Sequence, residues 1–441
     1  MSADTIFALA TPPGRSGVAV IRLSGPQTQA ILEAALAGPG PAPRKAALRF
    51  IHDAGGQGID QGLILFFPGP ASFTGEDCAE FQVHGGPAII EALVDRLLEL
   101  GARPAEAGEF TRRAFEHGKL DLTEAEGLAD LVDAETSAQR EQALAQMTGA
   151  LKSLYEDWRT QLVSIMAAIE GEIDFPDEDG VPDHLAQTAR TAIQSLQDQM
   201  RLHLDDNHRG EKIRGGFNIA IIGPPNAGKS SLLNALAKRD AAIVTDIPGT
   251  TRDIVEVRMV LAGFSVTLAD TAGLRASQDS IEQEGVKRAL TRADSADLVV
   301  GVFDGSALCN QEMARVVEKA HLLVLNKSDL EHRLTLPDSE RVTIQAAITS
   351  GKGVPDIERW LESEVTKCLG RREMPALSRA RHRRNVEQAF AALTRAADSL
   401  DQPEFAGEDL RLATRALESL TGRVDVEDVL GEVFSRFCVG K

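Results

Sequence analysis

The sequence predicts a multidomain protein with an α+β N-terminal domain, a discontinuous all-α domain and an α/β domain inserted into the all-α domain. Short apolar runs separated by glycine and proline turns fill residues 1–118. Apolar residues then recur at three- and four-residue spacing in 119–213 and again in 373–441, which indicates amphipathic helices. Between these stretches, in 214–372, short apolar runs alternate with helical patterns, which is typical of a parallel sheet with crossover helices. Each helical stretch has an apolar face that needs a partner, so we expect the two stretches to form one domain.

The N-terminal domain is expected to contain several strands and a helix. The runs VAVIRLS, GLILFF and AEFQVHG have the length and the apolar content of strands. The segment PAIIEALVDRLLEL (87–100) has helical spacing and a proline in its first turn. These features predict the mixed α+β character of residues 1–118.

Long helical patterns make up the two parts of the all-α domain. The first part contains LTEAEGLADLVDAETSAQREQALAQM and LKSLYEDWRTQLVSIMAAIEGEI. An acidic loop with two prolines (174–184) interrupts them, and a further helix is expected over 184–205. After residue 376, three more helices are predicted by HRRNVEQAFAALTRAADSL, DLRLATRALESL and VDVEDVLGEVFSRF.

Composition limits the class of protein. The chain has 441 residues, 47 Lys and Arg, and 66 Asp and Glu, which gives a formal net charge of −19. With 43% apolar residues it can bury several cores, and no run of ~18 apolar residues predicts a membrane span. The charge disfavours tight, direct binding of nucleic acid over most of the surface. The four cysteines form no CxxC pair and the first residues carry no secretory pattern, so we expect a reducing, cytoplasmic location without a zinc site or disulfides.

A phosphate-binding loop is predicted at Gly223–Ser230, which fits the pattern GxxxxGK[ST]. It follows the expected strand FNIAIIG and opens the expected helix SSLLNALAK, as this motif requires. Backbone amides of the loop and the helix N-terminus favour phosphate oxygens. Lys229 is expected to reach the β- and γ-phosphates, and Ser230 to bind Mg²⁺. The expected nucleotide contacts of this loop are Asn226, Ala227, Gly228, Lys229, Ser230 and Ser231.

Three further motifs resemble those of the GTPase family, in the order that this family has. Asn326, Lys327 and Asp329 follow the apolar run HLLVL and resemble the guanine-reading NKxD motif, in which the Asp accepts from guanine N1–H and the exocyclic amine. Asp270, Thr271, Ala272 and Gly273 resemble DxxG, with Asp270 behind Mg²⁺ and Gly273 near the γ-phosphate. Thr245, Thr250 and Thr251 lie in a segment that resembles switch I, with Thr251 as a second Mg²⁺ ligand. The last guanine-side motif is degraded to Ala347-Ile348-Thr349, so a modest nucleotide affinity is expected.

The sequence does not contain the usual residue that orients the attacking water after the DxxG motif. The residue after DxxG is Leu274, which has no polar group to orient water. Asn226 resembles the P-loop asparagine of GTPases that bind K⁺ beside the phosphates, where backbone oxygens matching Thr245, Ile247 and Thr250 complete the cation shell. Two alternatives remain open. Asn226 caps the P-loop turn, or an arginine, Arg252 or Arg275, takes the place of the cation.

The flanking segments resemble the MnmE (TrmE) family of tRNA modification GTPases. The resemblance rests on TIFALATPPGRSGVAVIRLSG, FPGPASFTGEDCAEFQVHGG, GEFTRRAFEHGKLDLTEAEGLADLVDAET and the terminal FCVGK, and it spans essentially the whole chain. It implies an N-terminal folate-binding and dimer-forming domain, a helical domain in two parts and an inserted, Ras-like GTPase domain. Some positions depart from the usual family pattern, namely Pro224, Pro248 and His117.

The same resemblance implies the chemistry. Family members act with an FAD-dependent partner, MnmG (GidA), to add an aminomethyl or carboxymethylaminomethyl group to C5 of the wobble uridine of certain tRNAs. The implied carbon source is 5-formyl-tetrahydrofolate or a related tetrahydrofolate. The implied folate contacts are Arg22, Glu80, Lys119 and Lys441, although surface ion pairs are the alternative for the first three. Glu282 matches the catalytic glutamate that positions water once two G domains meet, with Glu284 as its neighbouring alternative.

Competing functions remain at this stage. A potassium-stimulated GTPase of ribosome assembly shares the nucleotide motifs but leaves the flanking segments unexplained. A folate enzyme acting alone lacks a GxGxxG fingerprint for the redox steps. The segment 371–384 carries six arginines and either touches tRNA phosphate or is a solvated helix entry. Cys438 is either a reactive thiol near the folate or a small buried residue. Together with the net charge, these features predict weak tRNA binding by the chain alone and a partner that holds most of the tRNA.

Overall fold

The computed structural model describes most of the chain, and its contacts divide the chain into two compact units. The described residues are 4–174, 185–238, 255–270, 293–307, 311–334, 341–370, 374–424, 430–431, 433–434, 437 and 440. The first unit comprises residues 1–132, 145–197 and 385–441, and the second comprises 133–144 and 198–384. Each unit is described by itself.

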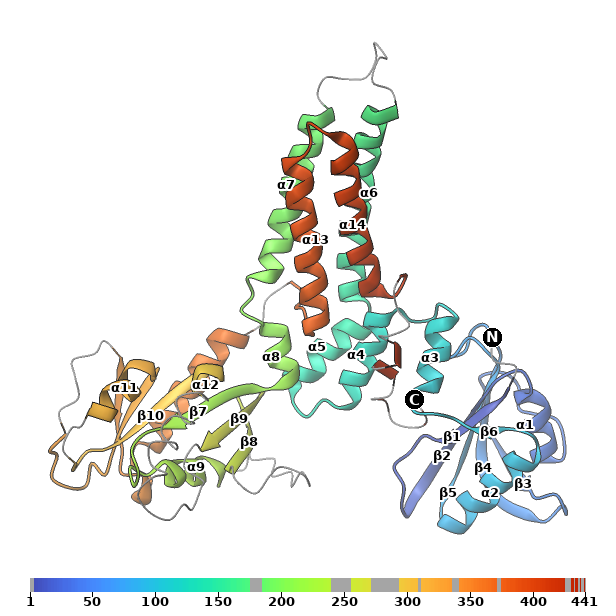
Figure 1. Ribbon diagram of the computed structural model, residues 1–441. Coiled ribbons are helices and arrows are strands. Elements are labelled where there is room, and N and C mark those ends of the chain that lie inside the picture. The colour runs from blue at the N-terminus through green and yellow to red at the C-terminus, as the bar shows by residue number, and fades with distance from the viewer. Residues whose placement is uncertain are drawn as a thin grey trace, which may run out of the picture. The chain divides into compact units, whose positions relative to one another are not determined.

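The first unit begins with a six-stranded mixed sheet in the order β3-β4-β5-β2-β1-β6 (Figure 1). The strands are β1 (Ile6–Leu9), β2 (Ser16–Ser24), β3 (Ala47–His52), β4 (Gly58–Phe67), β5 (Cys78–Gly85) and β6 (Arg103–Pro104). All neighbouring pairs are antiparallel except β1 and β6. Helices α1 (Thr28–Leu36) and α2 (Pro87–Glu99) supply buried leucines and isoleucines to the core on one face of the sheet. The strand and helix patterns of the N-terminal sequence are therefore confirmed.

The opposite face of this sheet exposes apolar side chains along one edge. Leu48 and Phe50 on β3 are each 56% exposed, and Leu63, which pairs with Leu48, is 42% exposed. Because side chains alternate between faces and the strands are in register, Arg22 and Glu80 project from this same face. The apolar edge thus continues into a charged pair.

Among the described residues, four helices lie wholly within the first unit: α3 (Glu109–Glu116), α4 (Leu122–Val132), α6 (Ala150–Asp174) and α14 (Pro403–Thr421). Three more helices, α5 (Ser137–Met147), α7 (Leu185–Leu204) and α13 (Ala380–Asp398), belong to both units, because the division between the units falls within each of them. Phe110 of α3 packs against Ile6 of β1. Helices α6 and α14 run side by side, and Arg159 and Glu418 form an ion pair between them at 2.8 Å (Figure 1). The side chain of Gln197 on α7 donates to Thr394 on α13. The chain that precedes the inserted segment therefore packs with the chain that follows it, as the amphipathic patterns predict.

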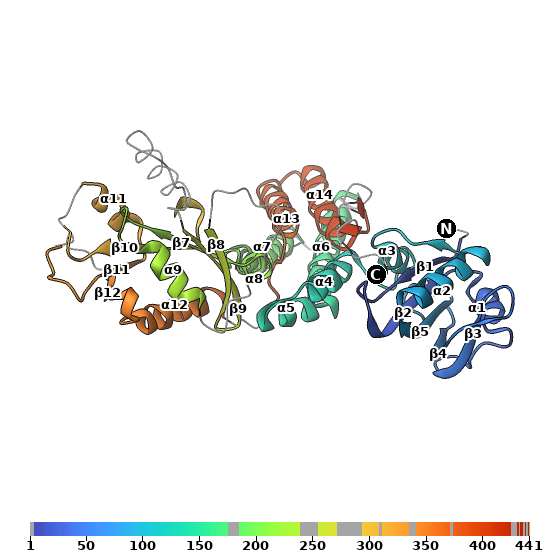
Figure 2. The same cartoon turned by 90° about the horizontal axis from the view of Figure 1, so that it is seen from below.

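The second unit contains a six-stranded sheet in the order β12-β11-β10-β7-β9-β8. Its elements are α8 (Arg209–Gly215), β7 (Phe217–Ile222), α9 (Lys229–Ala237), β8 (Val255–Leu261), β9 (Phe264–Asp270), β10 (Leu298–Asp304), α11 (Gln311–Lys319), β11 (Leu322–Asn326), β12 (Val342–Gln345) and α12 (Val354–Leu369). All its strand pairs are parallel except β8 with β9. Helices α9 and α12 lie on one face of the sheet and α11 lies on the other (Figure 2). Their apolar residues pack against the strands in two separate cores. This doubly wound α/β arrangement is the one that the alternating pattern predicts.

One expected helix near the C-terminus is only partly covered by the described residues. The helix predicted from VDVEDVLGEVFSRF lies mostly outside the described residues. The described Phe434 and Phe437 pack against Ala125 of α4. Within the described helices, none combines the length and the apolar character that crossing a membrane requires.

Candidate functional site

The phosphate-binding loop lies at the carboxyl end of β7 and leads into α9. Three of its residues have positive φ angles, namely Gly223 (151°), Asn226 (59°) and Gly228 (100°). A Cβ atom on Gly223 would lie 2.1 Å from the carbonyl oxygen of Val302, so glycine is required there. This sequence therefore folds into the strand–loop–helix geometry that presents backbone amides to an anion.

Lys229 is the most buried charge of this loop, with 6% of its surface exposed. Its ammonium group donates to the carbonyl oxygens of Gly223 (2.9 Å) and Pro224 (2.8 Å). The Lys229 side chain therefore folds back over the phosphate-binding loop and bonds to its first two residues. Asn226, Ser230 and Ser231 are exposed, and no hydrogen bond joins the side chain of Asn226 to another described residue. The alternative that Asn226 caps the turn gains no support from the described part of the chain.

Asn326 joins the NKxD segment to the phosphate-binding loop. Its side-chain amide donates to the carbonyl oxygen of Ala227 at 2.8 Å, and its side-chain oxygen accepts from the amide of Ile348 at 3.1 Å. Asn326 is 4% exposed, so both bonds are made away from water. One buried side chain therefore fixes the positions of the P-loop, β11 and the Ala347-Ile348 turn relative to one another.

Asp304 extends this arrangement, although it was not among the residues expected from the sequence. It lies opposite Asn326 at the ends of the paired strands β10 and β11, and it accepts from Lys327 at 2.6 Å. Burial alone would raise the pKa of Asp304, but hydrogen bonds from Lys327 and Ser306 outweigh burial and lower that pKa. The sequence could have identified Asp304 as a candidate, because it ends an apolar strand, and parallel strands place ligand-binding residues at this end. Asp329, the carboxylate expected to meet the guanine base, is exposed.

Several expected site residues cannot be placed. Thr245, Ile247, Thr250, Thr251, Thr271, Ala272, Gly273, Glu282, Cys438 and Lys441 lie outside the described residues, as do Arg252, Leu274, Arg275 and Glu284. Asp270 ends β9, next to Ile221 of β7, which brings its backbone to the edge of the sheet where the P-loop begins.

The N-terminal sheet brings two of the expected folate contacts together. Arg22 on β2 and Glu80 on β5 are paired residues, and the guanidinium group donates to Glu80 Oε1 at 2.9 and 3.2 Å. The guanidinium carbon lies 5.6 Å from the ring centroid of Phe73 and 5.9 Å from that of Phe110. This makes a cationic group held between two rings and a carboxylate.

Of the other two folate candidates, only Lys119 is among the described residues. Lys119 donates to the carbonyl oxygen of Pro70 at 2.8 Å. Lys441 is not described, but a Cβ on its neighbour Gly440 would lie 2.8 Å from the carbonyl oxygen of Leu9. Leu9 pairs with Ile21, the residue before Arg22. Gly440 thus lies against the end of β1, the strand that pairs with β2, and β2 carries Arg22.

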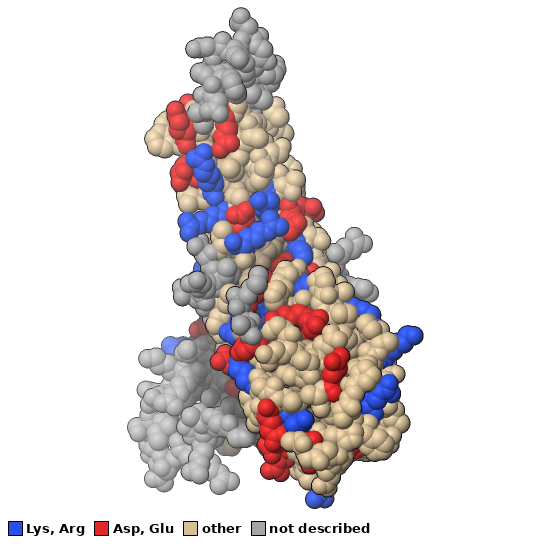
Figure 3. Space-filling view, turned by 90° about the vertical axis from the view of Figure 1, so that its right-hand side faces the viewer, with Lys and Arg blue, Asp and Glu red and all other residues tan. Residues whose placement is uncertain are grey.

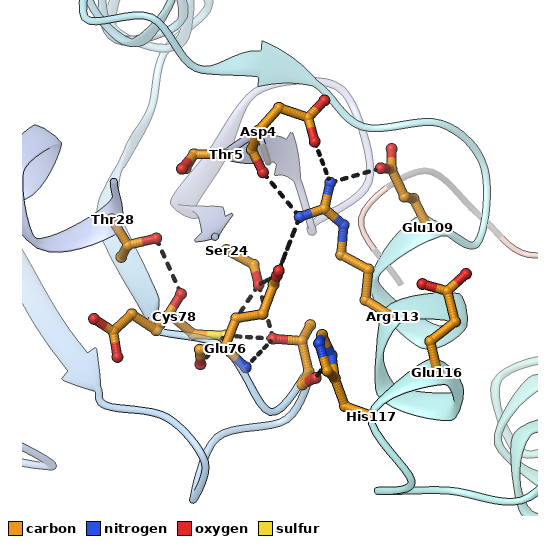
Figure 4. Close-up of polar contacts among 12 residues, drawn as sticks. Asp4, Thr5, Ser24, Thr28, Glu76, Cys78, Glu109, Arg113, Glu116 and His117 are labelled. Atoms are coloured by element: carbon orange, nitrogen blue, oxygen red, sulfur yellow. Dashed lines mark hydrogen bonds and ion pairs between the residues drawn. The ribbon is translucent and has the colours of Figure 1, made fainter. Parts of the chain in front are cut away.

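Helix α3 carries a cluster of charges that was not identified from the sequence (Figure 4). Arg113 and Glu109, one turn apart on α3, are 2% and 1% exposed and form an ion pair at 2.9 Å. Arg103 binds Glu109 at 2.6 Å and also contacts Asp4. The i,i+4 spacing of Glu109 and Arg113 in GEFTRRAF was a signal for a helical ion pair, but it gave no indication of burial.

We expect Glu109 to make the first unit sensitive to acid. Burial by itself would raise the pKa of Glu109, but hydrogen bonds from Arg103, the Glu106 amide and Arg113 outweigh it and lower the pKa from 4.5 to about 2. A lowered folded-state pKa stabilises the protein above the unfolded pKa, and this stability is lost as the pH falls from about 4.5 to about 2. The shift corresponds to about 3 kcal/mol at neutral pH.

This expectation is checked by urea unfolding of the wild type and a Glu109→Gln variant, followed by Trp158 fluorescence in a Trp360→Phe background. Trp158 lies on α6 of the first unit and Trp360 lies on α12 of the second. The difference in the free energy of unfolding between the two proteins should shrink between pH 5 and pH 3. A difference that stays constant over this range would contradict the assignment.

The arginine-rich segment 371–384 is not a free basic surface in its described part. Arg383 is 7% exposed and binds Asp206 at 2.6 Å and Glu211 at 3.0 Å. On the helices of the first unit, basic and acidic side chains are interspersed on the face shown in Figure 3. Arg411 and Arg423 of the first unit bind Glu170 and Glu156 of α6. These contacts favour the structural interpretation of Arg383 over contact with phosphate.

Comparisons with known proteins agree with this arrangement. The family described as "GTP-binding protein TrmE N-terminus" matches residues 5–119, and the family "MnmE helical domain" matches residues 122–438. The tRNA modification GTPase MnmE of Maricaulis maris is 60% identical over 441 residues, with 99% of each chain covered. The protein of the same name from Caulobacter vibrioides is 51% identical, covering 99% of this chain and 100% of that relative.

Among solved structures, the G domain of the T. maritima FeoB iron transporter is 23% identical, covers 34% of this chain and 97% of its own, and gives a TM-score of 0.25. That likeness is too weak to carry an argument. The full-length relatives and the two matching family descriptions are sufficient: the chain belongs to the MnmE family of tRNA modification GTPases.

Proposed function

We propose that this protein hydrolyses GTP and, with an FAD-dependent partner of the MnmG (GidA) type, modifies C5 of the wobble uridine in certain tRNAs. The group added is aminomethyl or carboxymethylaminomethyl, with 5-formyl-tetrahydrofolate or a related tetrahydrofolate as the carbon source. The observation that carries the proposal is the Asn326 bridge between the P-loop and the NKxD segment, in a chain with full-length MnmE relatives. The alternative of a ribosome-assembly GTPase does not account for the match of residues 5–119 to the TrmE N-terminus.

The proposed domain boundaries follow the same assignment. Residues 1–118 form the folate-binding and dimer-forming domain, 119–213 and 373–441 form the helical domain, and 214–372 form the GTPase domain. The family matches at 5–119 and 122–438 support the first of these boundaries.

In the nucleotide site, the chain's own residues have separate roles. The backbone amides of the P-loop bind the phosphates, and the Lys229 ammonium group contacts the β- and γ-phosphates and offsets their negative charge. Asp329 selects guanine, because a carboxylate accepts from two donors that adenine does not present together. The Ser230 hydroxyl, exposed at the first turn of α9, and Thr251 would hold Mg²⁺, which offsets phosphate charge. Asn226 and the backbone oxygens of Thr245, Ile247 and Thr250 would hold K⁺ in place of an arginine finger.

Water activation is assigned to Glu282, which orients the attacking water once two G domains meet. We expect hydrolysis in K⁺ to exceed hydrolysis in Na⁺ at equal ionic strength, by about tenfold or more, because a correctly sized cation replaces an arginine finger. Steady-state phosphate release in the two salts checks this. Equal rates would remove the cation from the mechanism, and a Glu282→Ala variant that hydrolyses normally would remove Glu282.

The folate proposal rests on the contacts around Arg22. Glu80 can accept from the amino-pyrimidinone edge of a pterin, while Arg22, Lys119 and Lys441 suit the carboxylates of a glutamate tail. The approach of Gly440 to Leu9 supports the inclusion of the terminal lysine. The bound folate would supply the one-carbon unit.

The homodimer proposal is supported by the exposed apolar edge of the N-terminal sheet. Leu48, Phe50 and Leu63 offer a contiguous apolar surface that a second copy would cover. This face also carries Arg22 and Glu80, so dimer formation would shield the folate contacts from water. Two such protomers with two partner chains would give a heterotetramer.

The FAD partner and tRNA enter through the complex. The chain carries a net charge of −19, and Arg383 is bound to carboxylates, so the partner is assigned most of the contact with tRNA. We place the reaction in the cytoplasm, where tRNA is modified. We expect the isolated chain to bind tRNA weakly, and tight, salt-resistant binding would contradict this assignment.

The function is tested by an inventory of wobble-uridine modification in cells that lack this protein. Mass spectrometry should find the C5 group missing, and co-purification should recover an FAD protein. Restoration by the wild-type gene, but not by a Lys229→Met variant, would tie the loss to the nucleotide site. An unchanged inventory would refute the proposed function.

A further inference from the structure

Arg113 of α3 and His117, the residue that follows this helix, contact the segment between β4 and β5 (residues 68–77). Arg113 donates to Glu76 Oε2 at 3.1 Å and to Oε1 at 3.3 Å. One turn further along, Nδ1 of His117 is 2.7 Å from the carbonyl oxygen of Thr74. Figure 4 shows the side chains of Arg113 and His117 pointing toward this loop.

The loop is tied to the sheet at the same two residues. Ser24 of β2 donates to Glu76 Oε2 at 2.9 Å, and its hydroxyl is 2.7 Å from that of Thr74. Ser24 and Thr74 are both fully buried. Glu76 is therefore the carboxylate at which the loop, the sheet and α3 meet, and Arg113 is the cation that compensates its charge.

The other end of this loop contacts two residues of the proposed folate site. The ring of Phe73 lies against the guanidinium group of Arg22, and the carbonyl oxygen of Pro70 accepts from Lys119. Helix α3 contributes again, because Phe110 is the second ring beside Arg22. A shift of loop 68–77 relative to α3 would therefore move the surroundings of both cationic groups.

Arg113 has further contacts that fix its own position. Its guanidinium group also binds Glu109 at 2.9 Å and Asp4 at 3.1 Å. The group is 2% exposed, and a planar guanidinium can meet three carboxylates at fixed angles, whereas a lysine ammonium cannot reproduce this fork. The position of Glu76 is thus set by a rigid, buried partner.

We propose that Arg113, acting through Glu76, is a positioning residue for the reduced-folate site: it holds loop 68–77 so that Arg22 and Lys119 are presented together. The inference rests on the proposed folate function and deepens it. Arg113 itself touches no ligand in this proposal.

The test measures 5-formyl-tetrahydrofolate binding by calorimetry with the full-length protein and its Glu76→Gln and Arg113→Lys variants. Glu76→Gln keeps the shape of the side chain and removes the charge that Arg113 binds. We expect both variants to bind about tenfold more weakly, since small displacements of a preorganised site have effects of this order or larger. Amide hydrogen exchange should accelerate within 68–77 and stay unchanged in β2 and β5.

Arg103→Lys is the matched control. Arg103 binds Asp4 and Glu109 of the same buried cluster, and no contact joins it to loop 68–77 among the described residues. We expect this variant to lower the melting temperature while folate affinity stays within twofold of the wild type. GTP hydrolysis should be the same in all variants, which shows that the second unit is folded.

Two results would overturn the positioning role. One is wild-type folate affinity in Glu76→Gln, and the other is an equal loss of affinity in Arg103→Lys, which would indicate general destabilisation. If the wild type itself does not bind 5-formyl-tetrahydrofolate, the folate assignment fails and the positioning role fails with it. That outcome is visible in the wild type alone and so is distinguishable from the other two.

Discussion

A Lys229→Met variant is expected to lose GTP hydrolysis by about 100- to 1000-fold, the range found when one preorganised donor is removed from a developing charge. Lys229 is the buried cation of the P-loop, and methionine keeps much of its length and apolar stem without the charge. Nucleotide affinity should fall as well, because the ammonium meets phosphate charge in both the bound and the transition state. Phosphate release and binding of a fluorescent GTP analogue measure the two effects.

Lys238→Met provides the control for this change. Lys238 follows the same helix, α9, at its C-terminal end and is exposed. The same charge is therefore removed from the same element without touching the loop, and we expect hydrolysis within twofold of the wild type. If Lys238→Met reduced hydrolysis as much as Lys229→Met, the effect would belong to net charge and not to the P-loop.

An Asp329→Asn variant is expected to weaken GTP binding by at least about 100-fold. The Asp329 carboxylate is expected to accept hydrogen bonds from two donors of guanine, and a site that can no longer pair a polar group of its ligand binds that ligand much more weakly. An asparagine amide offers one acceptor and one donor, so it opposes the guanine amine and matches the C2 oxygen of xanthine. Binding of xanthosine triphosphate should therefore increase while GTP binding falls. Competition between the two nucleotides for the same protein measures this exchange.

Asp356→Asn makes the same chemical change on α12, where Asp356 is exposed and pairs with Arg359. It should leave the preference for GTP unchanged. Loss of GTP binding in Asp329→Asn without any gain for xanthosine triphosphate would indicate that Asp329 supports the loop and does not read the base.

The nucleotide site was largely predictable because its motifs are local. Gly223 and Gly228 stand where the backbone needs positive φ angles, and the loop is enclosed by a strand and a helix that its own sequence predicts. The pattern also identified Asn326 and Asp329, since both follow an apolar strand. The bond from Asn326 to Ala227 was not predictable, because it spans 99 residues and depends on the order of strands in the sheet.

The sequence by itself therefore determined the fold classes, the P-loop and the family. The tertiary structure decided which charges are buried together. Arg113 meets Glu76 and Asp4 across 37 and 109 residues, and Arg383 meets Asp206 across 177, so none of these three pairings has a local sequence pattern. The arginines of FTRRAF and RARHRR stand in similar local sequences, and only packing distinguishes a buried guanidinium, such as that of Arg113, from one that faces solvent, such as that of Arg384. The reason is physical: backbone conformation is encoded by neighbouring residues, whereas the partner of a buried charge is set by strand register and helix packing.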